Sequence, residues 1–216
     1  MAPVVKVYGT AKSWNISRVL VSLGEAGVQY EIVAVDFAAG EHMSPAHLAR
    51  NPFGQVPVLE DGDFCLWESR AITKYVCRKY KPELLRVGNL VGSATVDVWL
   101  EVEAQQYSPV MEAILIEIRL RPIFGHQVDE RVVEKNIEKL KKVLSVYESR
   151  LSSSKYLAGD FISLADLNHV STMLCLGITT YISVLDLYPN VRAWWDDLRA
   201  RPAARKVSDL MNPRGP

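Results

Sequence analysis

Residues 4–35 read VVKVYGTAKSWNISRVLVSLGEAGVQYEIVAV, and this stretch decides the fold class of the N-terminal part of the chain. Its first five residues are mostly β-branched and precede a glycine, which is typical of a strand. Residues 15–26 carry apolar side chains at helical spacing, and Gly27 is a natural helix end. Residues 30–35 alternate like a second strand. Two strands joined by one short helix predict a parallel βαβ unit with a right-handed crossover.

A hairpin and another helix follow an irregular segment. Two strand patterns, 56–59 and 64–67, flank Asp61-Gly62, a pair that favours a tight hairpin turn. A helical pattern over 70–79 comes next. The order βαβ followed by ββα is that of a thioredoxin-like sheet. We therefore expect an α/β, thioredoxin-like domain over residues 1–80.

The remainder of the chain shows helical periodicity only. Residues 81–90 contain a proline and a glycine and read as a linker. Residues 91–216 are expected to form an all-α domain. Its helices are predicted over about 93–121, over 129–151, after Ser163, after Pro189 and after Pro202.

The stretch 167–185 contains no Asp, Glu, Lys or Arg. It includes Asn168, His169 and Gly177, together with serines and threonines, and is too polar for a lone bilayer span. We expect one fully buried helix here and no membrane association. The segment just before it, Ser163-Leu164-Ala165-Asp166, resembles a capping box with Asp in place of Glu, which predicts a structural helix start.

The composition is that of a globular protein with a sizeable core, since 49% of the 216 residues are hydrophobic and 23% are charged. The 25 Lys and Arg balance the 25 Asp and Glu, which argues against nucleic acid or an anionic membrane as a partner. Three cysteines without a CxxC motif favour a reducing, cytoplasmic compartment over a disulfide framework. Four histidines form no HExxH motif, so we expect no metal site. The N-terminus shows no secretory signal.

Ser13 stands between the first strand and the first helix, where redox proteins with a thioredoxin-like fold carry a CxxC motif. Without a thiol at this place, dithiol redox chemistry is excluded. A hydroxyl at a helix N-terminus suits the stabilisation of a thiolate that a ligand brings in. The alternative is that Ser13 only caps the helix.

The segment 51–57 leads into the third strand and contains Val56-Pro57. A cis Val56–Pro57 bond would expose the backbone N–H and C=O of Val56 to an extended peptide. The alternative is a plain turn.

Glu68 and Ser69 bring a carboxylate and a hydroxyl to the start of a second helix. Ser69 and free backbone N–H groups suit a carboxylate, while Glu68 suits an ammonium, so the pair is complementary to an α-amino acid head group. The alternative is that Ser69 is the N-cap and Glu68 a favourable charge near the first turn.

Several longer motifs agree with one family. The chain resembles a phi-class, plant-type glutathione transferase from about Val4 to Met211. The motifs are SWNISR (13–18), EHMSPAHLARNPFGQVPVLEDGD (41–63), LWESRAITKY (66–75), KLKKVLSVYESRL (139–151) and YLAGDFISLADLNH (156–169). The resemblance implies a thioredoxin-like domain that binds glutathione, an all-helical domain that forms the hydrophobic substrate site, and a homodimer. It implies glutathione as co-substrate and no other cofactor.

The resemblance also implies roles for individual residues. Ser13 resembles the catalytic serine that donates to the glutathione thiolate, and Phe53 resembles an aromatic side chain inserted into the partner subunit. The implied glutathione-binding residues are His42 and Met43 for the glycyl carboxylate, Gln55 and Val56 for the cysteinyl unit, and Glu68 and Ser69 for the γ-glutamyl head. The implied wall of the electrophile pocket consists of Trp14, Phe37, Ile116 and Leu120.

The implied reaction is attack by the glutathione thiolate on a small hydrophobic electrophile, such as an aryl halide, a chloroacetamide or an organic hydroperoxide, in the detoxification of foreign compounds including herbicides. Met43 replaces a lysine of the family pattern, and Lys12, Ile116 and Arg119 stand where more apolar or aromatic residues are expected. One alternative is a non-catalytic carrier of hydrophobic ligands with the same fold. A thiol-transferring reductase would need cysteine at position 13.

Overall fold

A computed structural model describes residues 4–212 and divides the chain into two compact units. The first unit runs to Val87 and takes in the chain again from Arg201, and the second unit is Gly88–Ala200. The α/β class of the first unit and the all-α class of the second are confirmed. The sequence predicts a helical domain from residue 91 to the C-terminus, whereas the last helix packs with the first unit.

The first unit is built on a four-stranded sheet with strand order β2-β1-β3-β4. Strands β1 and β2 are parallel, which confirms the βαβ unit, and β3 is antiparallel to both β1 and β4. Asp61 pairs with Phe64 across the hairpin turn, as the Asp-Gly pair predicts. The strands are β1 (Val5–Tyr8), β2 (Tyr30–Val33), β3 (Val58–Asp61) and β4 (Phe64–Trp67).

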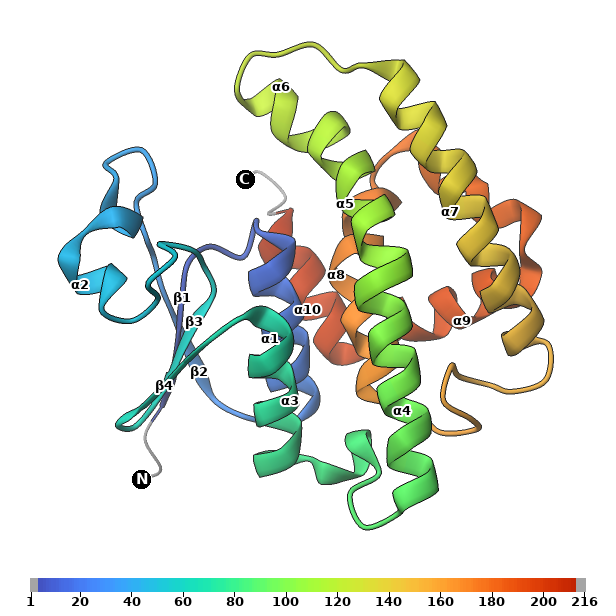
Figure 1. Ribbon diagram of the computed structural model, residues 1–216, viewed down its shortest axis with the longest axis horizontal. Helices are drawn as coiled ribbons and strands as arrows, with labels where there is room; N and C mark the ends of the chain where they lie inside the picture. Colours follow the sequence, from blue (N-terminus) through green and yellow to red (C-terminus); the bar gives the residue numbers. More distant parts are fainter. Residues whose placement is uncertain (1–3, 213–216) are drawn as a thin grey trace. The chain divides into compact units, whose positions relative to one another are not determined.

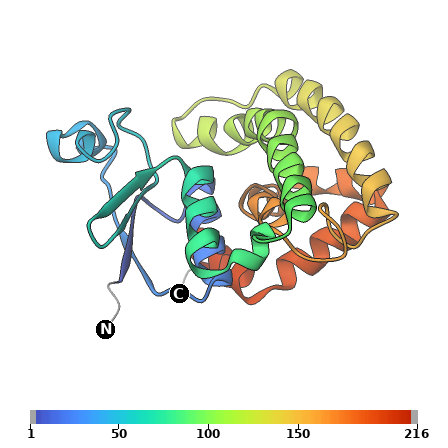
Figure 2. The same cartoon turned by 60° about the horizontal axis from the view of Figure 1, so that its bottom comes forward.

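Helices α1 and α3 pack side by side on one face of this sheet, and the short α2 lies on its other side (Figure 1, Figure 2). Helix α1 buries the apolar face formed by Ile16, Val19, Leu20 and Leu23, and ends where Gly27 adopts a φ of +68°. The helices of this unit are α1 (Trp14–Glu25), α2 (Pro45–Leu48), α3 (Ser69–Tyr80) and α10 (Pro202–Met211), with 3-10 turns at Glu41–Met43 and Pro82–Leu85.

The C-terminal helix α10 packs directly against α1. Gly24 of α1 permits the close approach, because a Cβ at this position would lie 2.9 Å from the Cβ of Ala203. Next to this contact, Arg201 donates two hydrogen bonds of 2.7 Å to the carboxylate of Glu25. The first unit is therefore completed by residues from the far end of the chain.

The second unit contains helices and 3-10 or π turns. The long helix predicted over about 93–121 is interrupted twice by π-helical turns, at Glu103–Tyr107 and Ile116–Leu120. The elements are α4 (Leu90–Val102), α5 (Ser108–Leu115), α6 (Arg121–Ile123), α7 (Glu130–Leu151), α8 (Leu164–Gly177), a 3-10 segment (Thr180–Leu187) and α9 (Pro189–Ala200).

Helix α8 forms the centre of the second unit, because every residue from Leu164 to Leu176 is buried. The predicted capping box at its start is present. The prediction of one buried helix over 167–185 is wrong in its second half, since α8 ends at Gly177. The N–H and hydroxyl of Thr179 both donate to the carbonyl of Leu176, which satisfies that carbonyl and stops the helix.

The carboxylate of Asp166 accepts four hydrogen bonds in this core. Its donors are the N–H and hydroxyl of Ser163 (2.9 and 2.8 Å), the N–H of Leu157 (2.9 Å) and the indole N–H of Trp194 (3.0 Å). Burial raises the pKa of this carboxyl, and the hydrogen bonds from Leu157, Ser163 and Trp194 oppose that rise. The network joins the start of α8 to the preceding loop and to α9.

Candidate active site

A narrow cleft in the first unit collects polar groups from three separate segments. It is lined by Asn15, Asn51, Gln55, Val56, Pro57, Glu68 and Ser69, and its volume is about 50 Å³. Four residues that the sequence proposes for glutathione binding therefore line one cleft: Gln55, Val56, Glu68 and Ser69. The structure brings together the segment before β3 and the N-termini of α1 and α3.

The Val56–Pro57 bond is cis, as proposed from the sequence, so the plain-turn alternative is wrong. Within the described residues, neither the N–H nor the C=O of Val56 makes a hydrogen bond, and Val56 lines the cleft. The preceding carbonyl of Gln55 accepts hydrogen bonds from Nε2 of His47 (3.0 Å) and Nδ2 of Asn51 (2.9 Å). These two side chains hold the segment in place.

Glu68, and not Ser69, is the N-cap of α3. Its φ of +70° is uncommon for a residue with a side chain, and its carboxylate is exposed without a capping hydrogen bond. Ser69 is buried, and its hydroxyl accepts a hydrogen bond of 2.8 Å from Arg18. The alternative that Ser69 caps this helix is therefore wrong.

Ser13 is the N-cap residue of α1 by backbone position only. Its carbonyl accepts the first helical hydrogen bond, from the N–H of Ser17 at 2.9 Å, while its side chain makes no capping hydrogen bond. The alternative that the hydroxyl only caps the helix is thus wrong. Ser13 is half-buried and stands at the positive end of the helix dipole.

Arg18 and Asn51 support the cleft, although the sequence alone predicts a role for neither of them. Arg18 is fully buried and donates to Oδ1 of Asn15 and to the Ser69 hydroxyl, both at 2.8 Å, which ties the N-termini of α1 and α3 together. Asn51 also accepts from the N–H of Phe53 at 3.0 Å. An arginine within an apolar helix face was the available signal for Arg18, while Asn51 is indistinguishable in sequence from a turn residue.

His42 and Met43 lie on the 3-10 turn that precedes α2. The ring of His42 stacks on Phe37 with 4.6 Å between centroids, and its Nδ1 is buried without a hydrogen-bond partner among residues 4–212. Met43 is 57% exposed, and its sulfur lies against Gly54, where a Cβ would approach it to 2.6 Å. The glycine at position 54 therefore lets this turn pack onto the segment that leads to β3.

Comparisons with known proteins point to one family over nearly the whole chain. Two family models match, the glutathione S-transferase N-terminal domain at residues 3–78 and the glutathione S-transferase C-terminal domain at residues 108–202. A probable glutathione S-transferase of Oryza sativa subsp. japonica, GSTF2, is 62% identical over 214 residues and covers 99% of each chain. Glutathione S-transferase 1 of Zea mays is 60% identical over 213 residues, with the same coverage.

The chain belongs to the phi class of glutathione transferases. A solved structure of maize glutathione S-transferase I, in complex with an atrazine glutathione conjugate, matches this transferase with a TM-score of 0.96 and 58% identity. The match covers 99% of this chain and 100% of the maize chain. The protein is therefore an enzyme that transfers organic groups to the thiol of glutathione.

The residues expected to form the electrophile pocket of this transferase come from both units. Trp14 and Phe37 belong to the first unit, where Phe37 contacts His42 and the indole nitrogen of Trp14 is buried without a partner among the described residues. Ile116 and Leu120 belong to the second unit and begin and end its second π-helical turn. That all four line one pocket stays a prediction.

The transferase's own thiols are poorly suited to thiolate chemistry. Burial raises the pKa of Cys77 to about 12 and that of Cys175 to about 11, and it also raises the pKa of the exposed Cys65. Within residues 4–212, no group of three or more potential ligands could hold a metal ion, and no helix is long and apolar enough to cross a membrane.

Proposed function

We propose that the cleft binds glutathione with its sulfur at Ser13, and that the bound thiolate attacks a small hydrophobic electrophile. With an aryl chloride, the thiol proton leaves to solvent, the sulfur forms a bond to the ring carbon, and chloride departs with the bonding electrons. The observation that carries this proposal is the hydroxyl of Ser13, which stands at the N-terminus of α1 and is not used to cap it. A hydroxyl that donates to sulfur stabilises the thiolate over the thiol.

The remaining contacts follow from the chemistry of the tripeptide. The N–H and C=O of Val56 suit the backbone of the cysteinyl unit, next to Gln55. Glu68 and Ser69 suit the ammonium and carboxylate of the γ-glutamyl head, because a carboxylate is favoured at a helix N-terminus. His42 and Met43 are assigned to the glycyl carboxylate, since the buried Nδ1 of His42 has no hydrogen-bond partner in the described part of the chain.

The electrophile is assigned to the apolar side chains of Trp14, Phe37, Ile116 and Leu120. The maize relative's complex with an atrazine glutathione conjugate supports chloro-substituted herbicides as a substrate class for this chain. Conjugation rates over a panel of aryl halides, chloroacetamides and organic hydroperoxides test the proposal. If the protein converts none of these compounds but still binds apolar dyes, the alternative of a non-catalytic carrier of hydrophobic ligands would be favoured.

Met43 is expected to weaken glutathione binding relative to a lysine. Met43→Lys places a cation on an exposed turn beside His42, and such a contact is worth about 0.5–1 kcal/mol. The dissociation constant for glutathione should therefore fall a few fold at low ionic strength, and the gain should shrink in concentrated salt. Calorimetric titration of both proteins at two salt concentrations measures this. Equal affinities at low salt would show that position 43 does not face the glycyl carboxylate.

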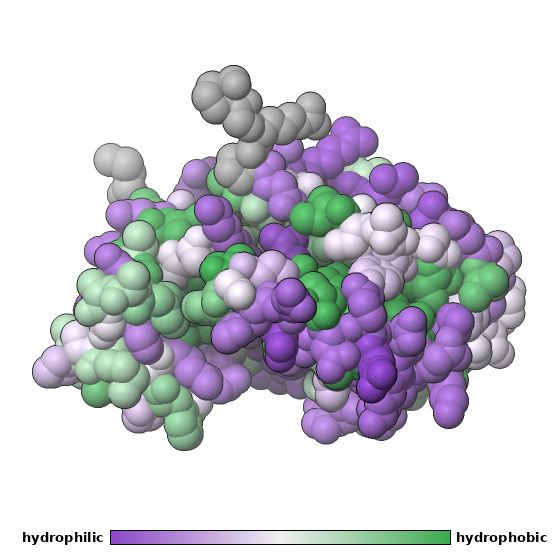
Figure 3. Space-filling model, turned by 90° about the horizontal axis from the view of Figure 1, so that it is seen from above, coloured by the Kyte–Doolittle hydropathy of each residue, from purple (hydrophilic) through white to green (hydrophobic). Residues whose placement is uncertain are grey.

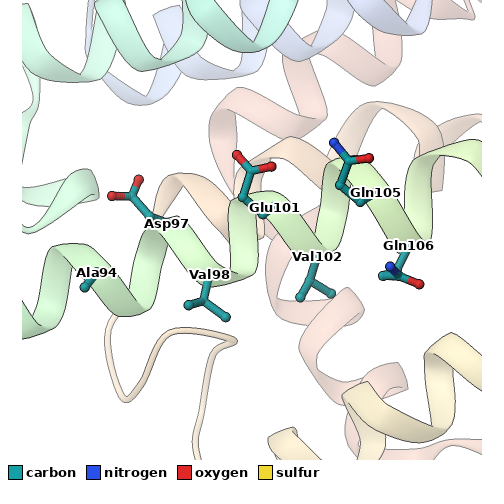
Figure 4. Close-up of a pocket in the computed structure, with 7 residues that line it drawn as sticks. All are labelled: Ala94, Asp97, Val98, Glu101, Val102, Gln105 and Gln106. Carbon is teal, nitrogen blue, oxygen red and sulfur yellow. The ribbon is translucent and has the colours of Figure 1, made fainter.

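A homodimer is the proposed assembly, and two exposed apolar features support it. Exposed apolar side chains occur at many places, as the green areas in Figure 3 show, so exposure alone does not identify an interface. Helix α4 is different because the exposed Val98 and the half-buried Val102 form an apolar stripe one turn apart. Val98 and Val102 point to one side of the helix, and Asp97 and Glu101 to another, along a groove on the surface of the second unit (Figure 4).

The second feature is Phe53, whose side chain is 66% exposed and touches only the edge of Trp67 among aromatic rings of the described chain. Phe53→Ala should raise the dimer dissociation constant about 30-fold or more, because a central aromatic anchor contributes about 2 kcal/mol or more to an interface. Phe124→Ala is the matched control, since Phe124 is 71% exposed, and it should leave association unchanged. Sedimentation velocity over a dilution series measures both. A monomeric parent protein at micromolar concentration would contradict the proposal.

A cytoplasmic location is proposed from the cysteines. All three are free, and Cys77 and Cys175 are buried in separate units. Free thiols are typical of a reducing compartment.

A further inference from the structure

The second π-helical turn, Ile116–Leu120, carries an arginine with an unusual environment. Nη1 of Arg119 is buried and has no hydrogen-bond partner among the described residues. The residue as a whole is only half-buried, so the guanidinium lies at the boundary between the core of the second unit and its surface. Single π-helical turns within longer helices occur often at functional sites.

The neighbouring charges are engaged elsewhere. Glu117 forms an ion pair with Arg121 at 3.2 Å and accepts a hydrogen bond from the N–H of Asp129 at 3.1 Å. Arg121 also donates to the carbonyl of Gln127. The positive charge of Arg119 opposes the rise in pKa that burial imposes on the Cys175 thiol of α8. The guanidinium of Arg119 therefore carries a charge without an anionic partner in the described chain.

An arrangement of this kind is unfavourable without a ligand. A buried donor without an acceptor lowers stability, and the loss is larger when the donor is charged. The planar guanidinium fork binds a carboxylate through two parallel hydrogen bonds, which is the geometry that an anionic ligand would supply. A ligand with a carboxylate would restore the missing interactions.

The place of Arg119 within the π-helical turn also points to the electrophile. Arg119 follows Ile116 by three residues, and residues three apart are neighbours on a helix surface. Leu120 ends the same turn. The proposed function assigns Ile116 and Leu120 to the electrophile, and this inference rests on that assignment. We infer that Arg119 is a specificity-determining residue that selects electrophiles bearing a carboxylate group.

A matched pair of substrates tests the inference. The compounds are 4-chloro-3,5-dinitrobenzoate and its carboxamide, which share the leaving group and the ring and differ in charge. The ratio of kcat/KM for the carboxylate over the carboxamide should fall about tenfold in Arg119→Gln. The change should appear mainly in KM, because the contact is equally strong in the ground state and the transition state. Arg119→Lys should recover part of the ratio.

Arg121→Gln is the control, because Arg121 is a half-buried arginine on the same helical run that already has partners. In Arg121→Gln, the ratio of kcat/KM for the carboxylate over the carboxamide should stay within about twofold of the ratio in the parent protein. Arg119→Met serves as a second variant in case glutamine perturbs folding. It should unfold no earlier than the parent, since it removes a charge that has no partner in the described chain.

Binding of the non-reacting analogues 3,5-dinitrobenzoate and 3,5-dinitrobenzamide, measured by calorimetry, separates this inference from the proposed function. If Arg119→Gln binds the benzoate more weakly but the benzamide equally well, the inference is supported, whether or not any electrophile is conjugated. A failure to conjugate any electrophile would overturn the proposed function and not this inference. An unchanged ratio of affinities, or an equal fall in Arg121→Gln, overturns the inference.

Discussion

Ser13→Ala is expected to lower conjugation about 10- to 100-fold while glutathione affinity changes no more than a few fold. A hydrogen bond to a charged group contributes about 1.5–3 kcal/mol, and 1.4 kcal/mol corresponds to one pKa unit. The pKa of the bound glutathione thiol should therefore rise by about one to two units. The tripeptide backbone and its two ends are bound by other residues, which explains the small change in affinity. Thiolate absorbance of the complex as a function of pH measures the shift directly.

Stability provides the control for this variant. Because the hydroxyl of Ser13 makes no capping hydrogen bond, Ser13→Ala should leave the urea unfolding midpoint unchanged. Asn89 caps α4 by accepting from the N–H of Gly92 at 2.9 Å, so Asn89→Ala should lower stability by about 1 kcal/mol and leave turnover unchanged. Ser13→Thr, which keeps a hydroxyl, should restore part of the activity. Near-full activity and an unchanged thiol pKa in Ser13→Ala would refute the proposed mechanism.

Asp166→Ala is expected to have the largest effect on stability, a loss of about 3 kcal/mol or more. The change removes an acceptor from four hydrogen bonds in a fully buried position and leaves the donors of Ser163, Leu157 and Trp194 unpaired. Each unsatisfied buried donor costs about 1–3 kcal/mol, although relaxation of the loop recovers part of this. The midpoint of urea unfolding at fixed protein concentration measures the loss.

Asp160→Ala is the matched control for Asp166→Ala. Asp160 lies on the loop before α8 and accepts one hydrogen bond, from the N–H of Lys155 at 3.0 Å, but it is exposed. Water can replace that bond, so the expected loss is below about 1 kcal/mol. Equal midpoints in the two variants would mean that the buried network contributes little to stability.

The fold follows largely from local patterns in the chain. Helical spacing and Gly27 place α1 within one residue of its end, and Asp61-Gly62 places the hairpin turn. The end of α8 was missed because the lack of charged residues over 167–185 indicates burial but says nothing about where Thr179 turns back to Leu176. The grouping of α10 with the first unit is a long-range contact that periodicity cannot reveal.

The candidate site also depends on long-range contacts that local sequence patterns cannot predict. Ser13 and Ser69 are both hydroxyls at helix starts, and each reads equally well as a cap. The structure distinguishes them through Arg18, which donates to Ser69 across 51 positions in sequence and leaves Ser13 unoccupied. A hydrogen bond between such distant residues depends on tertiary packing and is not encoded in either local pattern.

The contact between α10 and α1 bears on how the protein is made. Because the first unit is discontinuous in sequence, the partner surface of Gly24 and the counter-ion of Glu25 leave the ribosome only after the whole helical unit has been synthesised. During synthesis, α1 can make its contacts with Ala203 and Arg201 only after the helical unit between them has emerged. An excised N-terminal fragment would lack these residues altogether. The first unit therefore closes only after the helical unit has been made, which links its completion to the synthesis of Gly88–Ala200.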